Sequence, residues 1–209
     1  MEGKIDFVKQ DKQLYAPKTD PTIVDIPPML FIMYDGAGAA EDNPAFQQAF
    51  NALFGIAYSI KFMGKRPKPP EGYQDFKVPP PEGLWWMADD GEFDQNKPQL
   101  WRWTLMLRMP SFVTADLVKA VAEELVAKKM DDSYRKVRLE EYTEGTSVQL
   151  MHIGPYDQEQ ADLAKLQAFT DACGASYTGK HHELYFGDPR RTKPEKLKTV
   201  LRHTVILAA

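Results

Sequence analysis

HHELYFGDPRRTKPEKL, residues 181–197, is the stretch that decides the predicted fold. Its first six residues alternate as in a β-strand, which puts Glu183 and Tyr185 on one face and Leu184 and Phe186 on the other. The apolar face can pack on a core. Because the opposite face pairs a carboxylate with a phenol, we predict that this strand carries part of a functional site.

Two capping boxes predict where nearby helices begin. Thr192 and Glu195 have the spacing of a capping box that opens a short helix after the strand. Asp157 and Gln160 have the same spacing in front of an apolar helical pattern, for which Gly174 is the expected C-terminal stop. The strand is therefore expected to follow one helix and to precede another.

The composition favours an intracellular domain. With 209 residues, 43% of them apolar, the chain can bury the core of one large domain or two small ones. Its net charge of -4 argues against electrostatic binding of nucleic acid. One cysteine, no signal-peptide pattern and no apolar run of ~18 residues indicate a cytoplasmic protein outside the membrane. The four histidines lack metal-ligand spacing, so we expect neither a metal nor a cofactor.

Hydrophobic periodicity predicts the remaining elements. Strands are predicted at residues 29–34, 73–78, 84–87, 99–109, 138–142, 147–153, 181–186 and 202–207, and helices at 43–63, 114–129 and from 157 up to Gly174. Residues 1–28 are expected to form an extended lead-in. The proline-rich loop 66–81 is expected to act as a lid over a ligand.

The predicted elements repeat along the chain. Residues 29–135 and 136–209 each contain a strand, a glycine turn, a helix and two strands. Because neither half could cover a sheet face alone, we predict one α+β domain over residues 29–209. Its tandem strand–helix–strand–strand repeats would form one antiparallel sheet, with helices on one face and a concave ligand groove on the other.

Aromatic side chains are the candidates for lining this groove. Four tryptophans lie on predicted strands: Trp85, Trp86, Trp101 and Trp103. On a face without helices they would form a patch that suits flat, apolar and often cationic molecules. The alternative is that each tryptophan fills the core between sheet and helices. Strand register decides between the two, and the sequence does not fix it.

Three runs of sequence resemble the GyrI-like small-molecule-binding domain. They are Pro81–Trp86, Tyr58–Phe62 and His182–Leu197. The similarity extends from about Met29 onward and is greatest to the free-standing branch of that family, which lacks a DNA-binding module. The resemblance implies tandem repeats, a fold like that of SOUL haem-binding proteins, and a central groove in which a glutamate near Glu183 contacts the ligand.

The resemblance also implies a chemistry, because part of the free-standing branch hydrolyses cyclopropane-bearing DNA alkylators inside an aromatic cage. Water would add to a strained ring conjugated to a dienone, and ring opening would produce a phenol. Glu183 would act as an acid or orient the water, and Tyr185 or Tyr156 would donate to the developing phenolate. The residues expected to contact the ligand are Trp85, Trp86, Trp101, Trp103, Tyr58, Glu82 and Tyr34.

Three functions stay open at this point. The first is a hydrolase that opens strained, electrophilic xenobiotics and so protects the cell. The second is a non-catalytic protein that sequesters or senses drugs, with Glu183 as the charge partner of a cation. The third is an inhibitor of a DNA topoisomerase, as the family name suggests. We expect a monomer or homodimer with a small hydrophobic or cationic ligand, and neither nucleic acid nor membrane as a partner.

Overall fold

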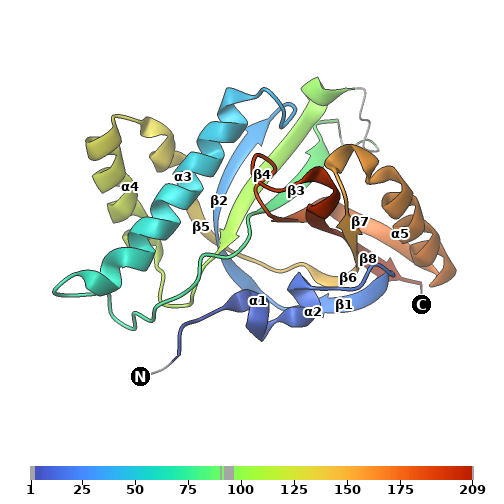
Figure 1. Cartoon of the computed structure of the whole chain (residues 1–209), viewed down its shortest axis with the longest axis horizontal. Coiled ribbons are helices and arrows are strands. Elements are labelled where there is room, and N and C mark those ends of the chain that lie inside the picture. The colour runs from blue at the N-terminus through green and yellow to red at the C-terminus, as the bar shows by residue number, and fades with distance from the viewer. Residues whose placement is uncertain (1–2, 90, 92–96, 209) are drawn as a thin grey trace. The chain divides into compact units, whose positions relative to one another are not determined.

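The computed structural model describes residues 3–89, 91 and 97–208 (Figure 1). Its strands are β1 Thr22–Ile26, β2 Met29–Ala37, β3 Glu82–Met87, β4 Trp101–Arg108, β5 Arg138–Tyr142, β6 Gly145–Ile153, β7 Ala175–Phe186 and β8 Lys198–Leu207. Its α-helices are α1 Phe7–Gln10, α2 Lys12–Tyr15, α3 Pro44–Lys61, α4 Ala115–Lys129 and α5 Gln160–Ala172. Its 3-10 helices are η1 Phe62–Lys65, η2 Pro98–Leu100, η3 Asp132–Lys136, η4 Tyr156–Gln158 and η5 Pro194–Lys196. None of these helices has both the length and the apolar character that a membrane span requires.

The described strands form one open antiparallel sheet, which confirms the predicted α+β class. Their order is β1-β6-β8-β7-β3-β4-β2-β5. The predicted repeat is present as β2–α3–β3–β4 and β6–α5–β7–β8, each of which runs strand, helix, strand, strand. Strands β1 and β5 are additions to this pattern, and they form the two edges of the sheet.

The chain divides into two compact units that are interleaved in sequence. The first consists of residues 1–10, 29–79 and 85–142, and the second of residues 11–28, 80–84 and 143–209. Strand β3 therefore begins in the second unit and ends in the first. Strand β5 belongs to the first unit, where it pairs with β2.

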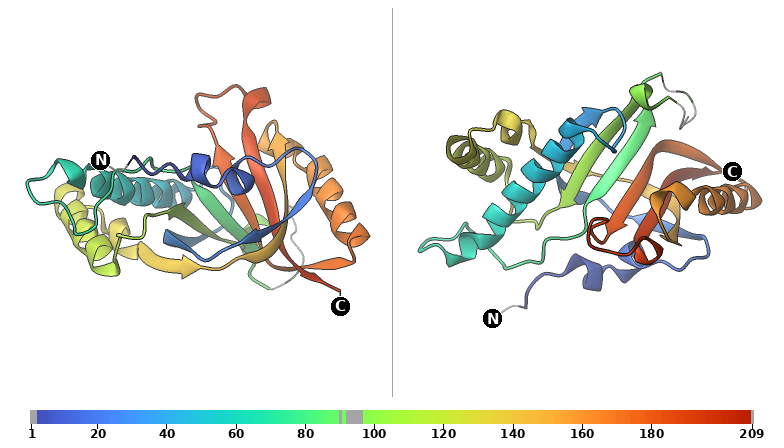
Figure 2. Two further views of the ribbon diagram at one scale, coloured as in Figure 1. Left: turned by 90° about the horizontal axis from the view of Figure 1, so that it is seen from below. Right: turned by 45° about the horizontal axis from the view of Figure 1, so that its top comes forward.

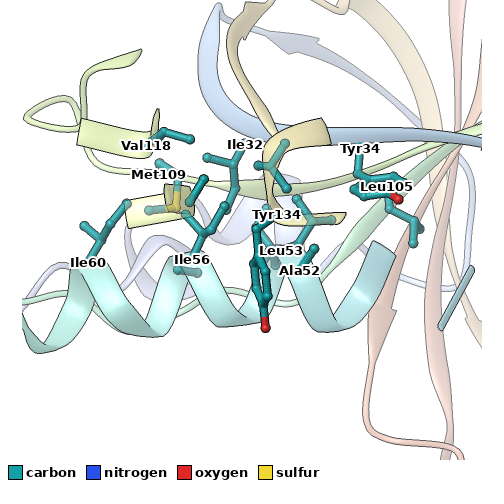
Figure 3. Close-up of a cluster of buried hydrophobic side chains, with 14 of the residues drawn as sticks. Ile32, Tyr34, Ala52, Leu53, Ile56, Ile60, Leu105, Met109, Val118 and Tyr134 are labelled. Atoms are coloured by element: carbon teal, nitrogen blue, oxygen red, sulfur yellow. The ribbon is translucent and has the colours of Figure 1, made fainter. Parts of the chain in front are cut away.

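Helix α3 organises the first unit and lies across β2 and β4 (Figure 1). Asn43 caps the helix, because its side chain accepts hydrogen bonds from the backbone of Ala45 and Phe46, and Pro44 occupies the first turn. The apolar side of the helix follows the 3.6-residue period. Figure 3 shows the resulting core, in which these side chains pack together: Ala52, Leu53, Ile56 and Ile60 of α3 with Ile32, Leu105, Val118 and Tyr134.

The second unit has a core of its own on the face that α5 covers (Figure 2). Its buried members are Val148, Leu150, Leu166, Ala175, Leu201 and Val205. Strand β8 is central to this unit, since it pairs with both β6 and β7 and is buried on both faces from Thr199 to Arg202. Two different environments can therefore form on the two sides of the same strands.

The N-terminal segment is more structured than an extended lead-in. Residues 1–28 contain α1, α2 and β1, and β1 pairs antiparallel with β6, with Ile23 opposite Val148. Residues 73–78, predicted as a strand, make only an isolated bridge between Phe76 and Ile5. The prolines that follow lack the N–H groups that a ladder needs.

Both predicted capping boxes are wrong. Before α5, residues 156–158 form η4, and Glu159 occupies the capping position without a side-chain cap hydrogen bond. After β7, η5 is preceded by Lys193, which also gives no side-chain cap. Both segments have the residue spacing of a capping box, but at both places the chain forms a 3-10 turn instead of the first turn of an α-helix. A 3-10 turn does not present the same backbone N–H groups to a capping side chain.

The proline-rich loop is fastened to the first unit. Arg66 forms an ion pair with Glu124 of α4 at 2.8 Å, and the hydroxyl of Tyr73 donates to the backbone oxygen of Lys61. The bridge at Phe76 adds a third attachment. Closure of the loop over a ligand would have to break these contacts. The role of the loop as a lid stays a prediction.

Gly36 tests the packing of the first unit. In the ladder between β2 and β4 it lies opposite Trp103, and an added Cβ would be 2.0 Å from the tryptophan ring. We predict that Gly36→Ala lowers the free energy of unfolding by about 1–3 kcal/mol, because Trp103 cannot move within a filled core. Urea unfolding measures the change. Gly3→Ala, where a Cβ meets no atom within 4 Å, is the control, and equal midpoints for the two variants would contradict the packing.

Candidate functional site

Strand β7 turns successive side chains to opposite faces, which separates two charged clusters of the second unit. Glu183 pairs with Leu201, which packs in the core with Leu166 of α5, so Glu183 lies on the face that carries α5. His182 pairs with Arg202, and both are buried on the other face. The predicted alternation is confirmed, but Glu183 shares the helix-covered face. The sequence interpretation had expected Glu183 on the face without helices. That expectation failed because alternation along a strand defines two faces without showing which of them a helix covers.

Glu183 is held by a chain of histidines. Nε2 of His181 lies 2.9 Å from Oε1 of Glu183 and donates to it, since a carboxylate only accepts. Nδ1 of His181 lies 2.7 Å from Nε2 of His203. Burial alone would raise the pKa of Glu183, but the hydrogen bond and charge of His181 outweigh it and lower that pKa. Burial and the neighbouring His181 lower the pKa of His203 to about 2, so His203 is neutral.

Two tyrosines adjoin this carboxylate, as the sequence predicted. Tyr185 follows Glu183 on the same face, and its ring meets that of Tyr156 edge to face with centroids 6.0 Å apart. Tyr156 comes from η4 and is 39% exposed, so the cluster reaches the surface. Burial, followed by the charges of Glu159 and Glu183, raises the pKa of Tyr156 to about 12. Its phenol therefore remains a hydrogen-bond donor at neutral pH.

Sequence reasoning missed a second carboxyl group in this cluster. Glu159, at the start of α5, is only 7% exposed, and its Oε1 has no hydrogen-bond partner in the described part of the chain. Burial and then the charge of Glu183 raise the pKa of Glu159 to about 9, and the nearby Thr199 hydroxyl offsets this only in part, without a well-formed hydrogen bond. Glu159 is therefore protonated at neutral pH. An acidic residue in a first helical turn is ordinarily favourable and exposed, so nothing in the sequence marked it.

The other face of β7 holds a buried ionic network. His182 lies between two carboxylates, with Nδ1 2.9 Å from Glu144 and Nε2 3.1 Å from Glu82. The hydroxyl of Tyr15 donates to Glu82 at 3.1 Å. Glu82, which the sequence interpretation assigned to ligand contact, is thus fully buried and bonded to two side chains.

Arg202 completes this network. Its guanidinium donates to Glu144 at 3.2 Å, to Gln149 at 2.9 Å and to the backbone oxygen of Leu14 at 2.7 Å. Burial by itself would raise the pKa of Glu144 and lower that of His182. The positive charges of His182 and Arg202 outweigh burial and lower the pKa of Glu144. The negative charge of Glu144, together with the hydrogen bonds to Glu144 and Glu82, outweighs burial and raises the pKa of His182. Both groups are therefore charged in the interior.

A comparison with protein families identifies the domain. The model of the GyrI-like small molecule binding domain matches residues 19–202, which include every residue of both clusters except Leu14, Tyr15 and His203. The chain belongs to the GyrI-like family. A search of curated proteins gave no match.

Solved structures of three proteins from Listeria innocua are similar to this GyrI-like chain over nearly their whole length. An uncharacterized conserved protein shares 42% identity, with 97% of this chain and 100% of that chain covered and a TM-score of 0.91. A hydrolase shares 40% identity, with coverages of 97% and 100% and a TM-score of 0.87. Another structure named as a hydrolase shares 39% identity, with coverages of 98% and 100% and a TM-score of 0.90.

The tryptophans of this GyrI-like domain lie in different environments of the first unit. Trp103 is fully buried, Trp85 is nearly so, and both contact Phe46 of α3, with centroids 5.0 and 5.6 Å away. These two tryptophans therefore lie on the helix-covered face and fill the core. The sequence had left this open as the alternative to lining a groove. Trp86 and Trp101 are half-buried, and Trp101 meets Trp85 edge to face.

The two predicted tyrosine contacts of the first unit also differ. Tyr34 is buried in the core, whereas Tyr58 is 45% exposed on α3. Tyr58 belongs to a row of stacked rings one helical turn apart, formed by Phe50, Phe54, Tyr58 and Phe62. Within the described residues, no group of three or more His, Cys, Asp or Glu side chains could hold a metal ion.

Glu144 tests the network. We predict that Glu144→Gln lowers the free energy of unfolding by about 3–5 kcal/mol, because Arg202 is left buried without its charge partner. For the wild type, stability should fall as pH drops through the lowered pKa of Glu144, and again as pH rises through the raised pKa of His182. Urea unfolding at several pH values checks this. Glu141→Gln, at an exposed position, is the control, and equal losses in the two variants would contradict the prediction.

Proposed function

We propose that this GyrI-like protein binds flat, hydrophobic xenobiotics and adds water to those with a strained, electrophilic ring, such as cyclopropane-fused dienones that alkylate DNA. The observation that carries the proposal is the grouping of an ionised carboxylate, Glu183, with the phenols of Tyr156 and Tyr185 in a cluster that reaches the surface. Two of the similar Listeria structures bear the name hydrolase, which supports hydrolytic chemistry. The protein would act in the cytoplasm and protect the cell.

In the proposed reaction, Glu183 accepts a proton from water while the water oxygen bonds to the cyclopropane methylene carbon. The ring carbon–carbon bond breaks, and its electron pair moves through the dienone to the oxygen. His181 keeps Glu183 ionised before this step. Ring strain and aromatisation drive the reaction, so the protein has to orient the reactants and move protons rather than supply a strong nucleophile.

Tyr156 and Tyr185 would stabilise the charge that develops on the dienone oxygen. A phenol whose pKa is about 12 donates a hydrogen bond without losing its proton at neutral pH. As a separate proposal confined to the first unit, we suggest that each of the partly exposed aromatic side chains Trp86, Trp101 and Tyr58 stacks on flat, apolar molecules. The buried residues Trp85, Trp103 and Tyr34 would support them from the core of the same unit, whereas Glu82 belongs to the network around His182.

Glu183 itself favours a second candidate function, binding of cationic drugs without turnover. An ionised side chain that is 16% exposed and lies beside aromatic rings is a suitable partner for an organic cation. In both functions the partner is a small molecule. The net charge of -4 gives no support for nucleic acid as a partner in either function.

Incubation with a cyclopropane-fused dienone, followed by mass spectrometry of the ring-opened product, tests the proposal. We expect multiple turnovers by the wild type and a loss on the order of 100-fold or more in Glu183→Gln, because the base is removed. Glu195→Gln, an exposed position after β7, is the matched control. Tight binding without product in the wild type would exclude the hydrolase. Loss of affinity in Glu183→Gln for cationic ligands alone would then support the binding protein.

A further inference from the structure

The buried carboxyl of Glu159 has no part in the reaction described so far. A buried polar atom without a partner costs free energy, and such atoms deserve a functional explanation. Oε1 of Glu159 is one, and Oγ1 of the neighbouring Thr199 is another among the described residues. Thr199 pairs across the ladder with Tyr185, so both unpartnered atoms belong to the cluster around Glu183. A ligand oxygen would supply the hydrogen-bond partner that Glu159 lacks.

We propose that Glu159 is the catalytic acid of the hydrolysis, which protonates the carbonyl oxygen of the substrate while Glu183 takes a proton from the attacking water. The inference rests on the proposed function and assigns its proton donor. The substrate must carry an oxygen conjugated to the strained ring, because that oxygen receives both the electron pair and the proton. A strained ring without such an oxygen would bind without reacting.

The proposed step conserves atoms and charge. The water oxygen forms a bond to the methylene carbon, the ring bond breaks, and the dienone oxygen becomes a phenol with the proton of Glu159. Glu183 then holds the proton from water, and Glu159 is ionised. Transfer of that proton from Glu183 to Glu159 restores both groups, so the net change is substrate plus one water.

Proton affinities distinguish Glu159 from Tyr156. The product is a phenol, whose pKa is about 10 in an unperturbed tyrosine. An acid with a pKa of about 9 can deliver its proton to such an oxygen, whereas Tyr156, with a pKa of about 12, retains its own. Tyr156 therefore donates a hydrogen bond, and Glu159 donates the proton. Two carboxyl groups whose environments separate their pKa values in this way are suited to opposite roles.

The charged surroundings of Glu159 allow a pH test. The titratable groups that act on it are Glu183 from β7, Tyr156 from η4 and Asp162 from its own helix. Oδ2 of Asp162 lies 2.8 Å from Nδ1 of His152 on β6. The neighbour of Glu159 on β8 is Thr199, which carries no charge. Above pH 9 Glu159 loses its proton and repels the negative Glu183. Activity should therefore fall as pH rises through about 9.

The experiment compares the wild type with Glu159→Gln, using the cyclopropane-fused dienone as the probe. Glutamine keeps the volume and the hydrogen-bond donor of a neutral carboxyl group but cannot release a proton. We expect kcat to fall on the order of 100-fold or more with little change in affinity, and the activity loss near pH 9 to disappear. Asp157→Asn, two residues away and exposed, should match the wild type.

A second measurement follows the carboxyl group itself. Because the folded state raises the pKa of Glu159, wild-type stability should decrease as pH rises from the usual glutamate range to about 9. In Glu159→Gln this decrease should be smaller. Infrared difference spectra should show a protonated carboxyl band that titrates near pH 9 in the wild type and is missing from the variant.

The outcomes separate the two proposals. Turnover by Glu159→Gln at the wild-type rate, with the high-pH loss intact, would overturn the role of Glu159 and leave the hydrolase standing. Absence of product from the wild type would overturn the hydrolase and the acid role together. Should Glu159→Gln unfold, Glu159→Asp replaces it. The shorter acid should lower kcat yet keep the high-pH loss, and a wild-type rate would again overturn the proposal.

Discussion

The pairing of Glu144 with both His182 and Arg202 is the interaction on which the second unit depends. The network joins the segment around Tyr15, the start of β3 at Glu82, and strands β6, β7 and β8. Buried charges repay their desolvation only when every partner is present, so the network forms only after all of these segments have assembled. It also fixes register, because a shift of β7 by one residue would place Glu183 among these charges and move His182 to the face that carries α5.

The same unit shows why burial alone does not decide the charge of a carboxyl group. Glu144 and Glu159 are both buried, at 5% and 7% exposure. Glu144 faces His182 and Arg202, and its pKa is lowered, whereas Glu159 faces the negative Glu183, and its pKa is raised to about 9. Desolvation acts in the same direction on both, so the sign of the neighbouring charge determines the result. Glu183 is ionised for the same reason as Glu144, since His181 bonds to it.

Local patterns in the sequence were sufficient for most elements and for the grouping of Glu183 with Tyr185 on one face of a strand; the roles assigned to these side chains remain predictions. The periods of α3 and α4 predicted those helices because each buries one face on a nearby neighbour. The alternation of β4 predicted that strand, although residues 103–107 are buried on both faces. They could not predict β1, whose partner β6 lies in the other half of the chain. Glu183, Tyr185 and Tyr156 were predicted from alternation and resemblance. The burial of Glu82 was not foreseen and Glu159 was missed, because the partners that surround Glu82, and the burial and the Glu183 charge that raise the pKa of Glu159, come from segments distant in sequence.

The two clusters depend on each other although they lie on opposite faces. Glu183 follows His182 directly in sequence, so the network that fixes His182 also fixes the direction in which Glu183 points. Catalysis by oriented groups requires positions held within a fraction of an ångström, and a strand anchored by buried charges provides such support. In the proposed reaction the network would therefore contribute by holding Glu183 in place, without contact with a ligand. A change in its charges would disturb the geometry of Glu183 before it unfolded the unit, since local openings need less free energy than global unfolding.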